Sequence, residues 1–215
     1  VDVKSIYPAG ADLHSYEPTQ KDMMSAAKSD LFIYTGDDLD PVAKKVASTI
    51  KKDDKKLSLQ DKISKNDLLA DHHHEGEEEH HGEEEHHHHG KYDPHIWLDP
   101  KMDQTFAKEI KDQLVKKDPD HKKYYEKNYK KLNKDLENID KDMKDATKGK
   151  KGNAVFISHE SLGYLSNRYG FEQVGVQNMS AEDPSQKDLT NIVKEIKKNK
   201  VCLLYTSDAA DEEDS

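Results

Sequence analysis

Residues 154–176 (AVFISHESLGYLSNRYGFEQVGV) contain the pattern that decides the fold. Residues 154–158 are a short apolar run typical of a buried strand, and residues 171–176 predict a second strand. Residues 160–169, which lie between them, predict a helix. Because the strands of a strand–helix–strand unit run parallel, this order predicts an α/β fold.

The front of the chain repeats the same order of elements. Val1 and Val3 alternate with polar residues and predict a strand, and residues 31–34 (LFIY) predict a buried one. Helices are predicted after Pro18 and over residues 41–52. Alternating strands and helices again favour a mostly parallel sheet.

A long helix is predicted in the middle of the chain. Asp118 and Pro119 supply an N-cap and a first-turn proline. His121, which follows them among lysines, is interpreted as solvated. Apolar residues then recur at intervals of four and three, typical of a helix packed on one side; they are Tyr125, Tyr129, Leu132, Leu136, Ile139 and Met143. Such a helix can join two lobes, and a self-associating coiled coil is the alternative.

These elements divide the chain into two lobes. Residues 1–117 are predicted to form an N-terminal lobe, residues 118–148 the connecting helix and residues 149–200 a partial C-terminal lobe. Residues 185–199 add an amphipathic helix to the second lobe. The predicted fold class is therefore α/β, with two βα lobes whose parallel sheets are flanked by helices, and with the second lobe incomplete.

Residues 71–90 (DHHHEGEEEHHGEEEHHHHG) contain only His, Glu, Asp and Gly. Imidazole nitrogens and carboxylate oxygens, with no Lys or Arg among them, suit borderline divalent metals and zinc above all. We interpret the segment as a metal-collecting loop, and a solvated acidic loop is the alternative. Its candidate ligands are nine histidines, namely His72, His73, His74, His80, His81, His86, His87, His88 and His89.

Charge and composition exclude several classes of protein. The net charge is −10, and the loop alone supplies eight negative charges, so the remaining surface is nearly balanced and does not suggest a nucleic-acid partner. The single cysteine, Cys202, excludes an internal disulfide and a zinc finger built on paired cysteines. No stretch approaches the roughly 20 apolar residues that cross a bilayer.

Three of the histidines outside the loop follow predicted strands or lie in adjoining loops. His14 follows the first predicted strand, and His159 follows the strand at 154–158. His95 lies in YDPHIWLDP (92–100), where two Asp-Pro steps favour a short, rigid segment. Because ligands bind beyond the carboxyl ends of parallel strands, the three imidazoles are predicted to converge on tetrahedral zinc, with the fourth position left to carboxylate or water. A hydrogen-bonded loop histidine is the alternative for each.

Three motifs resemble those of a known family. GADLHSYEPTQKDM around His14, DPHIWLDP around His95 and ISHESLGYLSNRYGF around His159 are similar to the histidine motifs of zinc-binding solute-binding proteins of ABC uptake systems. That family includes manganese-binding relatives. The likeness covers essentially residues 1–200, and a His-rich insertion between the first two motifs is typical of the zinc branch.

The resemblance implies a site, a cargo and a partner. In the family each of these histidines is a metal ligand, so His14, His95 and His159 are assigned that role. Zn²⁺ is the expected cargo, with Mn²⁺ less favoured, and the expected partner is the transmembrane subunit of an ABC permease. We expect a monomer that acts outside the cytoplasm, either as a surface lipoprotein of a Gram-positive bacterium or in the periplasm.

The resemblance also implies segments that this sequence does not show. Family members usually have a further strand and helix before the position of Val1, preceded by a signal peptide that carries a lipid anchor in Gram-positive bacteria. We therefore expect contact with a membrane only through such an anchor. The family places a fourth ligand, usually Asp or Glu, near the C-terminus, and its identity here is unknown.

The last residues, 201–215 (VCLLYTSDAADEEDS), do not resemble the family. We interpret them as a non-native tail, and a divergent natural terminus is the alternative. In the first case its acidic residues are not ligands; these are Asp208, Asp211, Glu212 and Glu213.

Three functions compete on the sequence alone. The first is extracytoplasmic capture of Zn²⁺ in a cleft between the lobes, with delivery to a permease and no enzymatic step. The second is a zinc hydrolase with Glu160 as general base, although the chain has no HExxH helix. The third is a metal buffer that acts only through residues 71–90.

Overall fold

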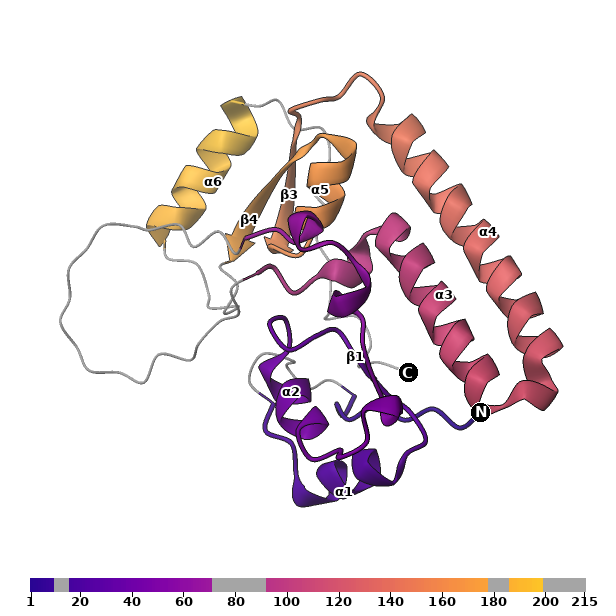
Figure 1. Cartoon of the computed structure of the whole chain (residues 1–215). Coiled ribbons are helices and arrows are strands. Elements are labelled where there is room, and N and C mark those ends of the chain that lie inside the picture. Colours follow the sequence, from indigo (N-terminus) through magenta and orange to yellow (C-terminus); the bar gives the residue numbers. More distant parts are fainter. Residues whose placement is uncertain (10–15, 71–91, 178–185, 199–215) are drawn as a thin grey trace, which may run out of the picture. The chain divides into compact units, whose positions relative to one another are not determined.

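The computed structural model describes residues 1–9, 16–70, 92–177 and 186–198. The chain divides into two compact units, Val1–Glu137 and Asn138–Ser215. Each unit contains helices beside a short two-stranded parallel sheet (Figure 1). The predicted α/β class with parallel pairing is therefore confirmed.

The first unit begins with α1 (Gln20–Lys28), β1 (Phe32–Tyr34), α2 (Pro41–Ala47) and β2 (Lys56–Ser58). The side chain of Thr19 accepts a hydrogen bond from the Asp22 backbone N–H, and the Asp22 carboxylate accepts one from the Thr19 backbone N–H, which forms a capping box at the start of α1. The helices pack with β1 around a buried apolar cluster formed by Ala26, Phe32, Ala43, Val46, Ala47 and Ile50.

Two sequence predictions in this unit were wrong, and one strand was missed. Residues 1–9 form no strand, and the side chains of Val1 and Val3 are exposed, because an alternation this short does not supply a paired edge. α2 ends at Ala47 rather than at residue 52, since a turn follows in which Ile50 N–H donates to Ala47. β2 was not predicted, because three residues among lysines carry no readable period.

Two long helices follow, α3 (Pro100–Lys117) and α4 (Lys122–Thr147), and a 3₁₀ turn (Pro119–His121) joins them. The predicted long helix is therefore confirmed. In the first unit Gln104 Nε2 donates to Asn133 Oδ1 at 3.0 Å, so α3 and this part of α4 lie side by side (Figure 1). The predicted stripe is buried unevenly: Tyr125 and Leu136 are buried, whereas Leu132 and Ile139 are exposed. Further 3₁₀ turns are Asp53–Lys55, Gln60–Lys62, Lys65–Asp67 and Ile96–Leu98.

The second unit contains β3 (Ala154–His159), α5 (Gly163–Tyr169), β4 (Glu172–Gln177) and α6 (Gln186–Lys198). β3 and β4 pair in parallel, as predicted, with Ala154 opposite Glu172 and His159 opposite Gln177. The end of α4 belongs to this unit, where Tyr169 O–H donates to the buried carboxylate of Asp140 at 3.0 Å. Among the described residues of this unit, the side chains of Phe156, Tyr164 and Tyr169 are buried.

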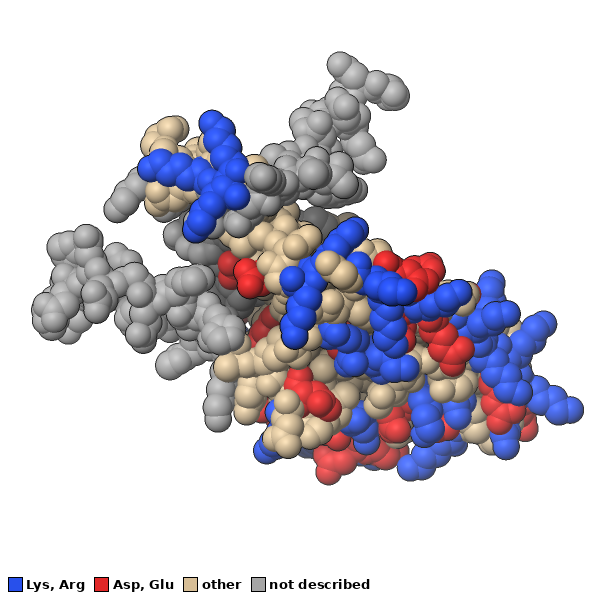
Figure 2. All heavy atoms as spheres, turned by 90° about the horizontal axis from the view of Figure 1, so that it is seen from above, with Lys and Arg blue, Asp and Glu red and all other residues tan. Residues whose placement is uncertain are grey.

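Figure 2 shows acidic and basic side chains interspersed over much of the described surface. Ion pairs such as Lys108–Asp112, at 3.0 Å, connect neighbouring charges. Within the described residues, no helix combines the length and the apolar character that a bilayer span requires.

Candidate metal centre

His95 lies in a short turn whose ends are fixed by hydrogen bonds. Asp93 N–H donates to the Leu69 carbonyl at 2.9 Å, and His95 leads into the 3₁₀ turn Ile96–Leu98. The next residue, Asp99, caps α3: its Oδ1 accepts from the backbone N–H groups of Lys101 and Met102. The two Asp-Pro steps thus place His95 between a fixed backbone and the start of a helix.

The imidazole of His95 is buried, with 4% of the residue exposed. Its Nδ1 lies 2.7 Å from Asp93 Oδ1, and the same oxygen accepts the His95 backbone N–H at 2.9 Å. The rings of His95 and Trp97 meet edge-on with their centroids 5.4 Å apart. Because Asp93 engages Nδ1, a metal bound by this ring would be held through Nε2.

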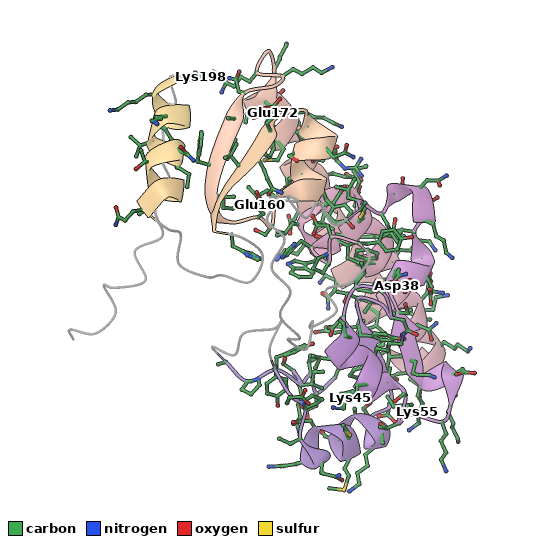
Figure 3. The ribbon with its side chains drawn as sticks, turned by 90° about the vertical axis from the view of Figure 1, so that its left-hand side faces the viewer. Asp38, Lys45, Lys55, Glu160, Glu172 and Lys198 are labelled. Carbon is green, nitrogen blue, oxygen red and sulfur yellow. The ribbon has the colours of Figure 1, made fainter. Side chains whose placement is uncertain are left out.

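His159 is the last residue of β3, and its turn is held against β4. Ser161 N–H donates to the His159 carbonyl at 2.8 Å. From β4, Gly175 N–H donates to Glu160 Oε1 at 3.0 Å (Figure 3, which labels Glu160 at the end of the sheet opposite Glu172). The Leu162 N–H donates to Gln173 Oε1 at 2.7 Å. Two side-chain contacts therefore fix the backbone that follows this histidine.

Gly175 is required for that arrangement. A Cβ atom built on it would lie 2.2 Å from Glu160 Cγ, closer than any van der Waals contact. This geometry corrects the predicted start of the helix: α5 begins at Gly163 rather than at Glu160. The physical reason is that residues 159–162 form a turn whose polar groups bond to β4 instead of to a helix.

Two carboxylates, Asp99 and Asp103, lie at the start of α3. Asp99 is buried, and Asp103 lies one helical turn further along. Burial, and then the neighbouring Asp99 carboxylate, raise the pKa of Asp103 to about 7. The acidic pair therefore carries less charge near neutral pH than two ordinary carboxylates would.

The structure separates the predicted ligands into those it describes and those it does not. His95 belongs to the first unit and His159 to the second. His14 and the nine histidines of residues 71–90 lie outside the described residues. Over the described ranges, no group of three His, Cys, Asp or Glu side chains is assembled to hold a metal. The predicted convergence of three imidazoles thus stays a prediction.

The residues that flank the His-rich loop are next to each other. Ala70 and Tyr92 form an isolated antiparallel bridge, so the loop leaves and re-enters the fold at one place. His121, by contrast, was predicted as solvated, and this is confirmed: its side chain is 68% exposed and its Nδ1 lies 2.8 Å from Asp118 Oδ1.

Sequence reasoning missed three residues that support the candidate ligands. Asp93 stands two positions before His95, and that spacing was a readable signal, because an Asp side chain commonly bonds to the backbone two residues on. Gln173 and Gly175 lie more than ten residues after His159 and contact its turn only through strand pairing. No local sequence pattern around His159 predicts these two residues.

Comparison with known families identifies the chain. The family model described as zinc-uptake complex component A, periplasmic, matches residues 1–214. The chain therefore belongs to the family of zinc-uptake complex component A proteins.

Two relatives illustrate the range of the family. The chain is 33% identical, over 97% of its length, to the high-affinity zinc uptake system protein ZnuA of Bacillus subtilis (strain 168), and it spans 65% of that protein. It is 28% identical, over 99% of its length, to the manganese ABC transporter substrate-binding lipoprotein PsaA of Streptococcus mitis, and it spans 67% of that protein. The chain thus corresponds to about two thirds of these relatives.

A solved structure has the same fold. The crystal structure of Zn(II)-bound AdcA from Streptococcus pneumoniae matches with a TM-score of 0.69 and 25% sequence identity, over 93% of this chain and 40% of that chain. This likeness agrees with the α/β architecture described above.

Proposed function

We propose that the chain is part of an extracytoplasmic protein that captures Zn²⁺ in a cleft between its two lobes and delivers it to an ABC-type permease. The observation that carries this proposal is the buried imidazole of His95, held at Nδ1 by the carboxylate of Asp93. A carboxylate behind a ligating histidine is the usual support of a protein metal site. Family membership adds a second line of support.

The proposed ligands are His14, His95 and His159, together with a fourth ligand that is not identified. Imidazole nitrogens favour Zn²⁺ over Mn²⁺, which prefers sites richer in oxygen. A relative named for manganese makes Mn²⁺ the competing cargo. We therefore expect equimolar Mn²⁺ to leave zinc binding unchanged when both metals are offered to the chain.

The loop at residues 71–90 is proposed to collect zinc and to raise its concentration near the site. Its histidines and carboxylates impose no single geometry, so it should bind several ions weakly rather than one ion tightly. The bridge between Ala70 and Tyr92 means that the loop can be replaced by a short turn without moving the residues on either side.

Calorimetric zinc titration of the chain with residues 71–90 replaced by two glycines tests the proposal. We expect one tight site, which the single substitutions His14→Ala, His95→Ala and His159→Ala each weaken at least tenfold. The variant His121→Ala is the matched control, because its imidazole also contacts an aspartate but is exposed. If tight binding disappeared with the loop, a metal buffer that acts only through the loop would be the better account.

The hydrolase alternative requires Glu160 as a general base. In the structure Glu160 packs against Gly175 and accepts its backbone N–H. This contact gives the carboxylate a structural part in the turn after His159. No described contact favours a hydrolytic function.

A further inference from the structure

We propose that Asp93 is a positioning residue that holds His95 in the tautomer with its proton on Nδ1, so that Nε2 is the metal-binding atom. The inference rests on the proposed function for its consequence in zinc binding. The tautomer itself is a property of the protein before any metal binds.

The contacts of Asp93 define the proton's position. Asp93 Oδ1 accepts the His95 backbone N–H at 2.9 Å and lies 2.7 Å from Nδ1. Because Oδ1 already accepts the backbone N–H, it acts as an acceptor toward Nδ1 as well, so Nδ1 carries the proton of this contact. In a neutral imidazole the other nitrogen, Nε2, then holds the lone pair.

Burial makes this preference effective. Both residues are buried, and a charge-assisted hydrogen bond is stronger where water does not compete for its partners. The carboxylate is itself anchored, because its backbone N–H donates to Leu69 and the next residue, Pro94, restricts the chain. Asp93 therefore fixes the ring from one side before zinc arrives.

The consequence for binding follows from the tautomer. If the proton sat on Nε2, zinc would have to displace it before it could bind there, and Nδ1 would have no proton to donate to Asp93. Loss of a supporting carboxylate of this kind typically weakens metal binding by about 10- to 100-fold. Asp93→Ala should show a loss of that size.

His121 supplies an internal control. Its Nδ1 contacts Asp118 Oδ1 at 2.8 Å, nearly the same distance, but the imidazole is exposed. Asp118→Ala removes an equivalent carboxylate from a histidine that has no proposed part in zinc binding. This variant should leave zinc affinity unchanged.

The first measurement is ¹⁵N NMR of the histidine ring nitrogens in the full chain without metal, with the His95 signals identified by their absence in His95→Gln. We expect a protonated Nδ1 in the native chain and in Asp93→Asn, because the amide oxygen can still accept both hydrogen bonds. Asp93→Ala should show a mixture of tautomers. A native His95 with its proton on Nε2 would overturn the proposal.

The second measurement is zinc affinity of the same full-length variants in zinc-buffered solution, followed by the fluorescence of Trp97. This is the only tryptophan, and it lies against the His95 ring, so its signal reports this site rather than the loop. We expect Asp93→Ala to lose 10- to 100-fold and Asp93→Asn less than tenfold. Unchanged affinity in Asp93→Ala would contradict the positioning role. An Nδ1-protonated His95 in a chain without a tight zinc site would support the role of Asp93 and refute the proposed function instead.

Discussion

The turns that hold His95 and His159 differ in what fixes them. The imidazole of His95 is held directly by a carboxylate two residues earlier, within one short segment. The turn after His159 is held through its backbone and through Glu160, by partners on β4. A candidate ligand can thus be fixed by its own motif or by a neighbouring strand, and the two arrangements should fail in different ways.

The largest effect is expected where the His159 turn meets β4. Gly175→Ala places a methyl group 2.2 Å from Glu160 Cγ, so the turn must move away from the strand. We expect a loss of about 1–3 kcal/mol in the unfolding free energy of the second unit. Urea denaturation followed by circular dichroism measures it.

The double variant Gly175→Ala with Glu160→Ala tests the cause. Removal of the Glu160 side chain makes room for the methyl group. The loss of unfolding free energy in the double variant should therefore be smaller than the sum of the two single losses. Strict additivity of the two losses would show that this contact does not hold the turn.

A substitution in the segment that holds His95 should reduce the unfolding free energy by a smaller amount. Asp99→Ala removes the side chain that caps α3, where Lys101 and Met102 donate to it. We expect a loss of about 1–2 kcal/mol in unfolding free energy, and Asp99→Asn should restore most of it, since asparagine caps helices equally well. Thermal unfolding of the three chains decides whether the cap contributes as described.

The acidic pair predicts a weak dependence of stability on pH. The folded-state pKa of Asp103 is raised to about 7. The folding stability that this group contributes is therefore fully present below the ordinary pKa of an aspartate and is lost as the pH rises through about 7. Because the side chain is partly exposed, the loss should be only about 1 kcal/mol. Urea midpoints at pH 5 and pH 8 should differ more for the native chain than for Asp103→Asn. If the urea midpoint changed equally with pH in both chains, the ionisation of Asp103 would not affect stability.

The smallest effect is expected at His121. The contact between this exposed imidazole and Asp118 resembles that of His95, but solvent competes with it. His121→Ala should change the unfolding free energy by less than about 0.5 kcal/mol. A larger change, measured by urea denaturation at pH 7, would mean that burial does not distinguish the two histidine–aspartate contacts.

Local patterns in the sequence predicted the parts of the fold that depend on local order. The apolar stripe from Tyr125 onward predicted the long helix, and the apolar runs at residues 154–158 and 171–176 predicted the paired strands. The turn after His159 was misread as a helix, because the contacts of Glu160 and Gln173 depend on strand pairing. The strand predicted at Val1 and Val3 was wrong because so short an alternation does not specify a strand with which it could pair.

The candidate site divides along the same line. His95 could be singled out from its motif, and Asp93 lies close enough in sequence to have been included. The contribution of Gly175 could not be predicted, because it depends on the space left beside Glu160 after folding. The pKa of Asp103 likewise depends on burial that composition does not reveal.

We propose that zinc binds tightly through His14, His95 and His159 rather than through residues 71–90. X-ray absorption at the zinc edge, on the loop-replaced chain with one equivalent of zinc, tests it directly. We expect a shell of nitrogen and oxygen ligands at about 2.0–2.1 Å with imidazole scattering, and one imidazole fewer in His95→Ala. An unchanged number of imidazole ligands in His95→Ala would contradict it.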